Sequence, residues 1–156
     1  MPHRSRTLLA LSSMLAVSAA YAEPAATPVR VLPGAGASLV VEIAALRNHK
    51  GQVIACITRE AKLFPHCERD KTMRAARAPA GEPLVFRDLV PGRYALALFH
   101  DENGNGRMDK VMGLPREGFA FSRDAPIHFG PPSFDEAAVA VPPGETRIKV
   151  KMRYLM

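Results

Sequence analysis

The sequence lacks the short motifs that mark most enzyme classes. It has no phosphate-binding glycine loop, no zinc-binding cysteine and histidine spacing, and no nucleophile elbow around Ser133. Asp101 and Asp109 could form an acid–base pair, but their spacing fits a cation site better. The sequence therefore favours a binding or structural protein, with a metal-dependent envelope hydrolase as the alternative from another class.

A large excess of positive charge and long apolar runs are also lacking. Without Arg4 and Arg6 in the first 22 residues, 19 Lys plus Arg stand against 15 Asp plus Glu, and the resulting charge of +4 is too low for the basic surface of a nucleic-acid-binding protein. After residue 22 no apolar run is long enough to form a transmembrane helix. We therefore expect neither nucleic acid as a partner nor a transmembrane segment in the mature chain.

The first 22 residues have the organisation of a secretory signal peptide. Arg4 and Arg6 precede a mostly apolar segment, residues 7–20, and the Ala20-Tyr21-Ala22 triplet fits the small-x-small cleavage rule. We expect cleavage after Ala22 and a periplasmic or secreted mature protein. An uncleaved amphipathic anchor is the alternative.

The only two cysteines, Cys56 and Cys67, both belong to the expected mature chain. They lack the CxxC spacing of a metal site or a redox pair, and an exported chain meets an oxidising environment. We expect a structural disulfide between them, which would stabilise the fold by about 3 kcal/mol in the chain-entropy model.

Seven short segments alternate apolar and polar residues or are rich in β-branched residues, as strands do. The expected strands are 39–46, 52–58, 72–78, 82–89, 93–100, 137–141 and 146–154. Residues 72–78 could instead be helical, because several of them have high helix propensity. The pattern predicts an all-β protein, an antiparallel seven-stranded β-sandwich over residues 38–156, preceded by a flexible leader at 23–37.

Residues 110–135, here called the excursion, have little regular periodicity. The segment is rich in glycine and proline, yet it contains Phe119, Phe121, Phe129 and Phe134. Disordered segments are poor in aromatic residues, so an ordered excursion is expected. It is expected to act as a lid over one end of the sandwich, and a pocket for a small hydrophobic ligand is the alternative.

Basic residues recur on one face of the last expected strand. Arg147, Lys149, Lys151 and Arg153 alternate with apolar residues. A solvated sheet face is the usual meaning of such a stripe. The alternative is a contact with an envelope protein or an anionic envelope polymer.

Residues 101–109, here called the acidic loop, open like a calcium-binding loop. The potential ligands are Asp101, Asn103, Asn105, the carbonyl of Arg107, and Asp109. Gly106 permits the sharp turn that such loops need. The twelfth position is Met112 and not a carboxylate, so we expect the excursion to complete the shell through Glu117 or Asp124. Calcium is the expected cofactor.

The same residues also allow a simpler interpretation, a tight turn whose residues adopt positive φ. Strand alternation predicts that Glu102 points outward. His100 precedes the loop and could bind a softer metal with His128, but a histidine that fixes the loop by a hydrogen bond is favoured.

Four segments resemble a known family. Residues 86–94 (FRDLVPGRY) resemble the F-x-D-L-x-P-G-x-Y pattern of transthyretin-like, or prealbumin-like, sandwich domains. Residues 100–109 (HDENGNGRMD), 113–122 (GLPREGFAFS) and 129–137 (FGPPSFDEA) follow in order. Over residues 39–154 the chain resembles the bacterial exported family catalogued as domain of unknown function two-one-four-one. The resemblance implies a seven-stranded sandwich outside the cytoplasm and implies no activity. The cysteine pair is not part of that pattern.

Overall fold

The computed structural model describes residues 36–156, and strands make up most of its regular structure. The strands are β1 (Ala37–Ala44), β2 (Gln52–Thr58), β3 (Arg74–Pro79), β4 (Leu84–Leu89), β5 (Gly92–Asp101), β6 (Lys110–Val111), β7 (Leu114–Pro115), β8 (Phe119–Phe121), β9 (Val139–Val141) and β10 (Gly144–Lys151). The helical elements are the 3₁₀ turns η1 (Ala61–Leu63), η2 (Cys67–Arg69) and η3 (Ser122–Asp124), and the single turn α1 (Phe134–Ala137). The expected all-β class is confirmed.

The expected signal peptide and most of the expected leader lie outside the described residues. The seven expected strands correspond to β1–β5, β9 and β10, and the excursion adds the short strands β6, β7 and β8. The strand β1 already begins at Ala37, the last residue assigned to the leader. Residues 74–79 form a strand and not a helix, because their pairing with β2 outweighs their helix propensity.

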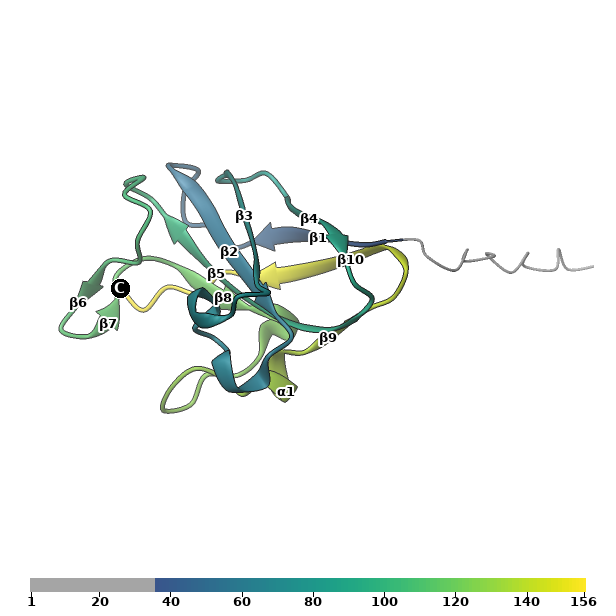
Figure 1. The fold of residues 1–156 in the computed structure, drawn as a ribbon. Helices are drawn as coiled ribbons and strands as arrows, with labels where there is room; N and C mark the ends of the chain where they lie inside the picture. The colour runs from purple at the N-terminus through teal and green to yellow at the C-terminus, as the bar shows by residue number, and fades with distance from the viewer. Residues whose placement is uncertain (1–35) are drawn as a thin grey trace, which may run out of the picture. The chain divides into compact units, whose positions relative to one another are not determined.

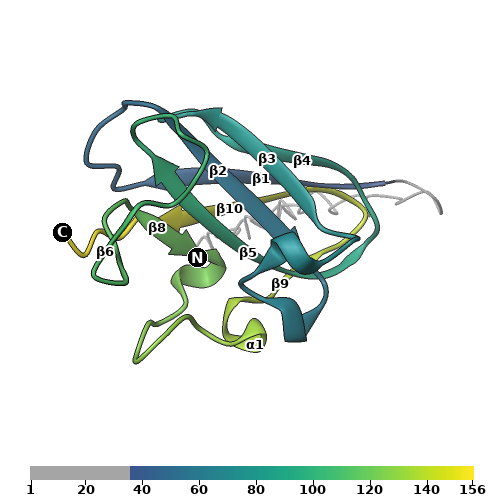
Figure 2. The ribbon, with the colours of Figure 1, turned by 60° about the vertical axis from the view of Figure 1, so that its left-hand side comes forward.

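The strands form two main sheets. One has the order β10-β1-β4, and the other has the order β3-β2-β5-β8, with β9 paired to the start of β5. Figure 1 shows their arrangement, and Figure 2 shows β1 and β10 behind the layer of β2, β3 and β5. One pairing departs from the expected antiparallel pattern: β1 and β10 run parallel from Ala37 opposite Gly144 to Ala44 opposite Lys151.

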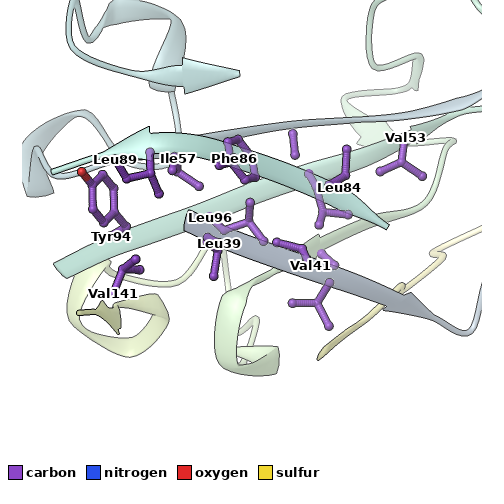
Figure 3. Close-up of a cluster of buried hydrophobic side chains, with 14 of the residues drawn as sticks. Leu39, Val41, Val53, Ile57, Leu84, Phe86, Leu89, Tyr94, Leu96 and Val141 are labelled. Carbon is purple, nitrogen blue, oxygen red and sulfur yellow. The ribbon is translucent and has the colours of Figure 1, made fainter. Parts of the chain in front are cut away.

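The main core is built from one face of each sheet. Leu39 and Val41 of β1 and Phe86 of β4 pack with Ile57 of β2 and Leu96 of β5, and all five are buried. Figure 3 shows these side chains directed toward one another between the strands. Burial of each such side chain contributes roughly 1.5–3 kcal/mol. Because successive side chains of a strand point to opposite faces, the alternation that predicts the strands also determines which face is packed inward.

The connection from β4 to β5 is held by a tyrosine. Pro91 and Gly92 follow β4, and the buried Tyr94 donates its hydroxyl to the carbonyl of Val90 at 2.8 Å. This hydrogen bond crosses the turn and fixes the start of β5, as tyrosine corners do in β-sandwich proteins. The far end of β5 runs directly into the acidic loop.

The two sheets differ in the faces that they turn to water. On β10, Arg147, Lys149 and Lys151 are exposed, as expected for a solvated face. On the outer face of the five-stranded sheet, cross-strand partners are apolar: Ile54 lies opposite Phe99, and Cys56 lies opposite Ala97. One outer face is therefore polar and the other is apolar, and the excursion lies on the apolar one.

Candidate functional site

The acidic loop is organised around a buried carboxylate. Asp101 is fully buried, and its carboxyl accepts three hydrogen bonds. The backbone N–H of Asn105 donates to Oδ1 at 3.0 Å, and the backbone N–H of Gly106 donates to Oδ2 at 2.8 Å. The side chain of Gln52 also donates to Oδ2, at 2.8 Å. Burial opposes ionisation of Asp101, but these hydrogen bonds outweigh it and lower the pKa of the carboxyl.

Asp109 closes the loop from its other end. The side-chain amides of Asn103 and Asn105 donate to its two carboxylate oxygens at 2.7 and 3.0 Å. The amide oxygens accept backbone N–H groups: Asn103 accepts from Asn105 at 3.1 Å, and Asn105 accepts from Arg107 at 2.8 Å. A half-turn of either amide would direct its oxygen toward Asp109, the orientation that a cation beside Asp109 requires.

Tight-turn chemistry is present in the same loop. Gly104 and Gly106 have φ of 74° and 75°, a conformation that glycine adopts without a steric penalty. Neither asparagine in the loop has a positive φ. The turn interpretation and the cation interpretation thus describe compatible properties of one loop, because a calcium loop needs the same sharp bend.

The structure places Glu117, one of the two excursion residues considered as a metal ligand, beside the acidic loop. Its side chain is buried, with 3% of the residue exposed. Oε1 accepts the backbone N–H of Glu102 at 3.1 Å, and Oε2 accepts the backbone N–H of Asp109 at 3.0 Å. Asp124, the other residue considered for this role, instead accepts the backbone N–H of Lys151 at 2.7 Å. Glu117 therefore ties the excursion to both ends of the loop.

The expectation that Glu102 points outward is wrong. Glu102 is half-buried and forms a bidentate ion pair with Arg47, whose Nε and Nη2 lie 2.6 and 2.9 Å from its oxygens. The hydrogen bond from Arg47 lowers the pKa of Glu102. Strand alternation fails here because β5 ends at Asp101. The sequence reasoning did not identify Arg47, which lies far from the loop along the chain.

A small polar cavity lies between these groups. It has a volume of about 140 Å³ and is lined by Arg47, Glu102, Asn103, Asp109, Arg116 and Glu117. This volume is sufficient for an ion with some of its water. Three carboxylates and two guanidinium groups line it, so most of the acidic charge is balanced within the protein. Within residues 36–156, no three acidic, histidine or cysteine side chains converge closely enough to form a metal site as they stand.

His100 makes hydrogen bonds, but not to the acidic loop. The buried ring lies 2.7 Å through Nε2 from the carbonyl of Lys50 and 2.8 Å through Nδ1 from the hydroxyl of Tyr154. A carbonyl can only accept, so Nε2 carries a proton. His100 thus links the β1–β2 turn to the end of the chain. Gly118 supports this arrangement, because a Cβ there would lie 2.3 Å from the Tyr154 ring.

The excursion covers one part of the apolar sheet face. Phe119 and Phe121 of β8 are buried with Ala95 of β5 in a second hydrophobic cluster, against which Phe64 and Phe134 pack. The helix α1 is held in place by a capping box between Ser133 and Glu136. The expected order of the excursion is therefore present, except that the side chain of Phe129 is fully exposed.

The rest of that face is open and forms a groove of about 1510 Å³. Its floor includes Ile54 and Cys56 of β2 and Ala97 and Phe99 of β5. Its walls come from three separate segments: the end of the acidic loop with β6 and β7, the 126–131 part of the excursion, and the turn near Pro65. We refer to this feature as the outer groove. His128 lies in its wall and not beside His100, so the considered pairing of the two histidines at a metal is wrong.

The expected disulfide is present beneath one wall of the outer groove. Cys56 and Cys67 are joined, with their Cα atoms 6.0 Å apart. Nearby, the buried carboxyl of Asp70 accepts hydrogen bonds from the Thr58 hydroxyl and from the backbone N–H and hydroxyl of Thr72, both at 2.7 Å. The hydrogen bond from Thr58 is the main reason that the pKa of Asp70 is lowered, against the effect of burial.

The basic stripe of the last strand is only partly free. Arg147 pairs with Glu145 at 2.9 Å, while Lys149 and Lys151 are exposed. Arg153 lies beyond β10 and donates to the carbonyls of Ala125 and Asp124. The residues that share an expected face thus have different roles, and Arg153 fastens the excursion.

No helix among residues 36–156 is long and apolar enough to cross a membrane.

Comparison with known proteins gives one match. Neither the curated proteins nor the solved structures yield a match to this chain. The family model described as "Uncharacterized protein conserved in bacteria (DUF2141)" matches residues 41–149. That match covers both sheets, the acidic loop and the excursion, and the chain belongs to this bacterial family.

Proposed function

We propose that the protein is an exported binding module that carries a small hydrophobic ligand in the outer groove. The observation that carries this proposal is the open, apolar and concave outer face of the five-stranded sheet. An antiparallel sheet normally turns a polar face to water, and the other sheet of this protein does so. Ligand sites in proteins are typically concave and lined mainly by apolar side chains.

Export and a transthyretin-like topology are parts of the same proposal. The sequence of residues 1–22 and the disulfide between Cys56 and Cys67 support an oxidising compartment. The position of the FRDLVPGRY motif at the β4–β5 turn, with the Tyr94 hydroxyl on Val90, supports the topology.

Native mass spectrometry of the exported protein tests the carrier role. We expect a copurified small molecule that is released on denaturation. In the variant Ala75→Trp an exposed floor residue is replaced by a side chain that fills the groove, so this mass should be absent. Lys149→Ala, on the other sheet, is the matched control and should retain the mass. The proposal would be contradicted if the wild type and both variants all showed only the mass of the bare chain and none of them took up added apolar probes.

We further propose that the acidic loop binds calcium and steadies one edge of the outer groove. The loop supplies Asp109, the side-chain oxygens of Asn103 and Asn105, and the neighbouring carboxylate of Glu117. Gly106, Arg107 and Met108 of the same loop line the groove. The number of available carboxylates is low, so millimolar affinity is expected.

The calcium proposal predicts a change in thermal stability. With a dissociation constant of about 1 mM, 10 mM calcium would stabilise the protein by about 1.4 kcal/mol, or roughly 3–6 °C in Tm. Asp109→Asn should lose this response, and Arg107→Ala should keep it, because Arg107 would contribute only its carbonyl. Equal Tm values in calcium and in chelator would contradict the proposal.

A metal-dependent hydrolase using the acidic loop is the competing function. The two can be separated with Asp101→Ala. In the binding module this variant loses about 2–3 kcal/mol of folding free energy, because buried donors lose their acceptor. A hydrolase would lose the same folding free energy, because the hydrogen bonds are the same, and would in addition show a metal-dependent activity in the wild type that the variant abolishes at temperatures where it is still folded.

A further inference from the structure

We infer that the ligand of the outer groove is a single-chain amphiphile with an anionic head group, such as a long-chain carboxylate. This inference rests on the proposed carrier function and adds the chemical class of the ligand. It is carried by the way in which charge and apolar surface are distributed along the groove.

The floor of the groove consists of two rows of residues that cross the sheet. In one row Arg77 of β3 pairs with Ile54, which pairs with Phe99, which pairs with Phe119. In the next row the partners are Ala75, Cys56, Ala97 and Phe121. Residues that are paired across antiparallel strands share a face, so both rows face the groove.

The second row forms a recess that is suited to an alkyl chain. Ala75 and Ala97 are short side chains, Cys56 between them is partly exposed and joined to Cys67, and the larger Ile54 and Phe99 border this row. No residue of the second row is charged. An alkyl chain that lies along this recess would remove apolar surface from water on both sides, at about 0.8 kcal/mol for each buried CH₂ group.

The positively charged side chains of the groove lie in the first row and on the acidic-loop side of it. Arg77, Arg107, Lys110 and Arg153 line the groove, and none of the residues that line it is an aspartate or glutamate. Arg77 lies in the first row, and the backbone of Arg153 pairs with that of Phe119 in the same row. Arg107 belongs to the acidic loop, and Lys110 belongs to β6. The positive charge is therefore placed at the end where β5 meets the acidic loop.

Three of these cations are available to a ligand. Within residues 36–156, Arg77, Arg107 and Lys110 take part in no ion pair. Arg153 is already engaged with backbone carbonyls. A head group with negative charge is the chemical complement of three unpaired cations beside an apolar recess.

The recess favours a single molecule over a membrane surface or a second copy of this chain. Its floor lies between walls formed by the β6–β7 hairpin, by residues 126–131 and by the turn near Pro65, so a flat bilayer would meet the walls first. The exposed Phe129 stands on one wall, where it can cover the chain of a bound amphiphile.

Calorimetry with three probes of equal chain length tests the inference on the mature protein. Dodecanoate, dodecanol and dodecyltrimethylammonium are each used below the concentration at which they aggregate. We expect dodecanoate to bind about tenfold more tightly than dodecanol, because three solvent-exposed ion pairs together contribute roughly that factor. The ammonium compound should bind most weakly, and the advantage of dodecanoate should shrink as salt is raised.

Two triple variants separate head-group recognition from overall charge. Arg77→Ala with Arg107→Ala and Lys110→Ala should weaken dodecanoate about tenfold and leave dodecanol within about twofold. Arg147→Ala with Lys149→Ala and Lys151→Ala removes the same charge from the other sheet and should change neither affinity. Ala75→Trp should abolish the binding of both probes.

Each outcome has a definite meaning. Equal affinity for dodecanoate and dodecanol overturns the anionic head group and leaves the carrier function standing. Binding of none of the probes overturns the carrier function itself. Cosedimentation with phosphatidylglycerol vesicles without binding of monomeric dodecanoate overturns the inference in favour of a membrane surface. Dimerisation that Ala75→Trp abolishes, again without dodecanoate binding, would assign the groove to a second copy.

Discussion

Three buried carboxylates hold separate parts of this chain by accepting hydrogen bonds from backbone N–H groups. Asp101 accepts from the acidic loop, Glu117 accepts from both ends of that loop, and Asp70 accepts from Thr72. A carboxylate has room for several donors, and hydrogen bonds to a charged acceptor are stronger than those between neutral groups. These side chains therefore fix loops that have little apolar surface of their own.

Asp70 gives a prediction about acid stability. Its folded pKa is lowered, chiefly by the hydrogen bond from Thr58, so its contribution to stability is present above the unfolded pKa of about 4. That contribution is lost as the pH falls through the folded pKa. We expect Asp70→Asn to reduce the free energy of unfolding by about 1–3 kcal/mol at pH 7 and by progressively less below pH 4.

Urea denaturation of both proteins from pH 7 to pH 2 measures this difference. The exposed Glu82→Gln is the control and should differ little from the wild type at any pH. A gap between wild type and Asp70→Asn that widens on acidification would contradict the sign of the pKa shift.

At the scale of elements, the connection between β7 and β8 is joined to the acidic loop by the side chain of Glu117 and by a backbone hydrogen bond from Arg116 to Asp109. Glu117→Ala would leave the backbone N–H groups of Glu102 and Asp109 without an acceptor. We expect a loss of about 1–3 kcal/mol of stability in chelator. Hydrogen exchange at these two amides should become faster, while exchange in β2 should follow only the global change.

The neighbouring exposed residue supplies the control for this prediction. Arg116→Ala retains the carbonyl that accepts from Arg47, and its stability should stay within about 0.5 kcal/mol of the wild type. If both variants exchange alike at Glu102 and Asp109, the link through Glu117 has no energetic role.

The strands could be predicted from the sequence because their signal is local. Alternation along β5 and β10 is readable from neighbouring residues. The parallel pairing of β1 with β10 was not predictable from alternation, since it depends on how distant segments meet.

The candidate site was predictable only in its local part. Spacing identified the residues of the acidic loop, and the absence of a position-twelve carboxylate pointed to the excursion and Glu117. The ion pair of Glu102 with Arg47 and the hydrogen bonds of His100 to Lys50 and Tyr154 join residues about 50 or more positions apart. No periodicity encodes such contacts, so the cavity and the outer groove emerge only from the fold.

At the scale of the whole molecule, the excursion turns part of the outer face of the five-stranded sheet into a groove. Export is the remaining molecular prediction that can be checked directly. Expressed from its own first residue in a bacterial host, the protein recovered outside the cytoplasm should begin at Glu23 by intact mass and N-terminal sequencing. Ala22→Arg should block this cleavage, because the processing site requires a small residue. A recovered protein that retains Met1 would support the uncleaved anchor instead.

The parallel pair of β1 and β10 has a consequence for how the chain folds. The strand β1 is flanked by β4 and by β10, and β10 is the last strand to be synthesised. The first sheet therefore cannot be completed until the C-terminal residues have left the ribosome, and contacts so distant in sequence slow folding. A chain that stays incompletely folded during synthesis is also one that can be threaded through a narrow translocation channel. The position of β10 in the first sheet is therefore compatible with the export proposed above.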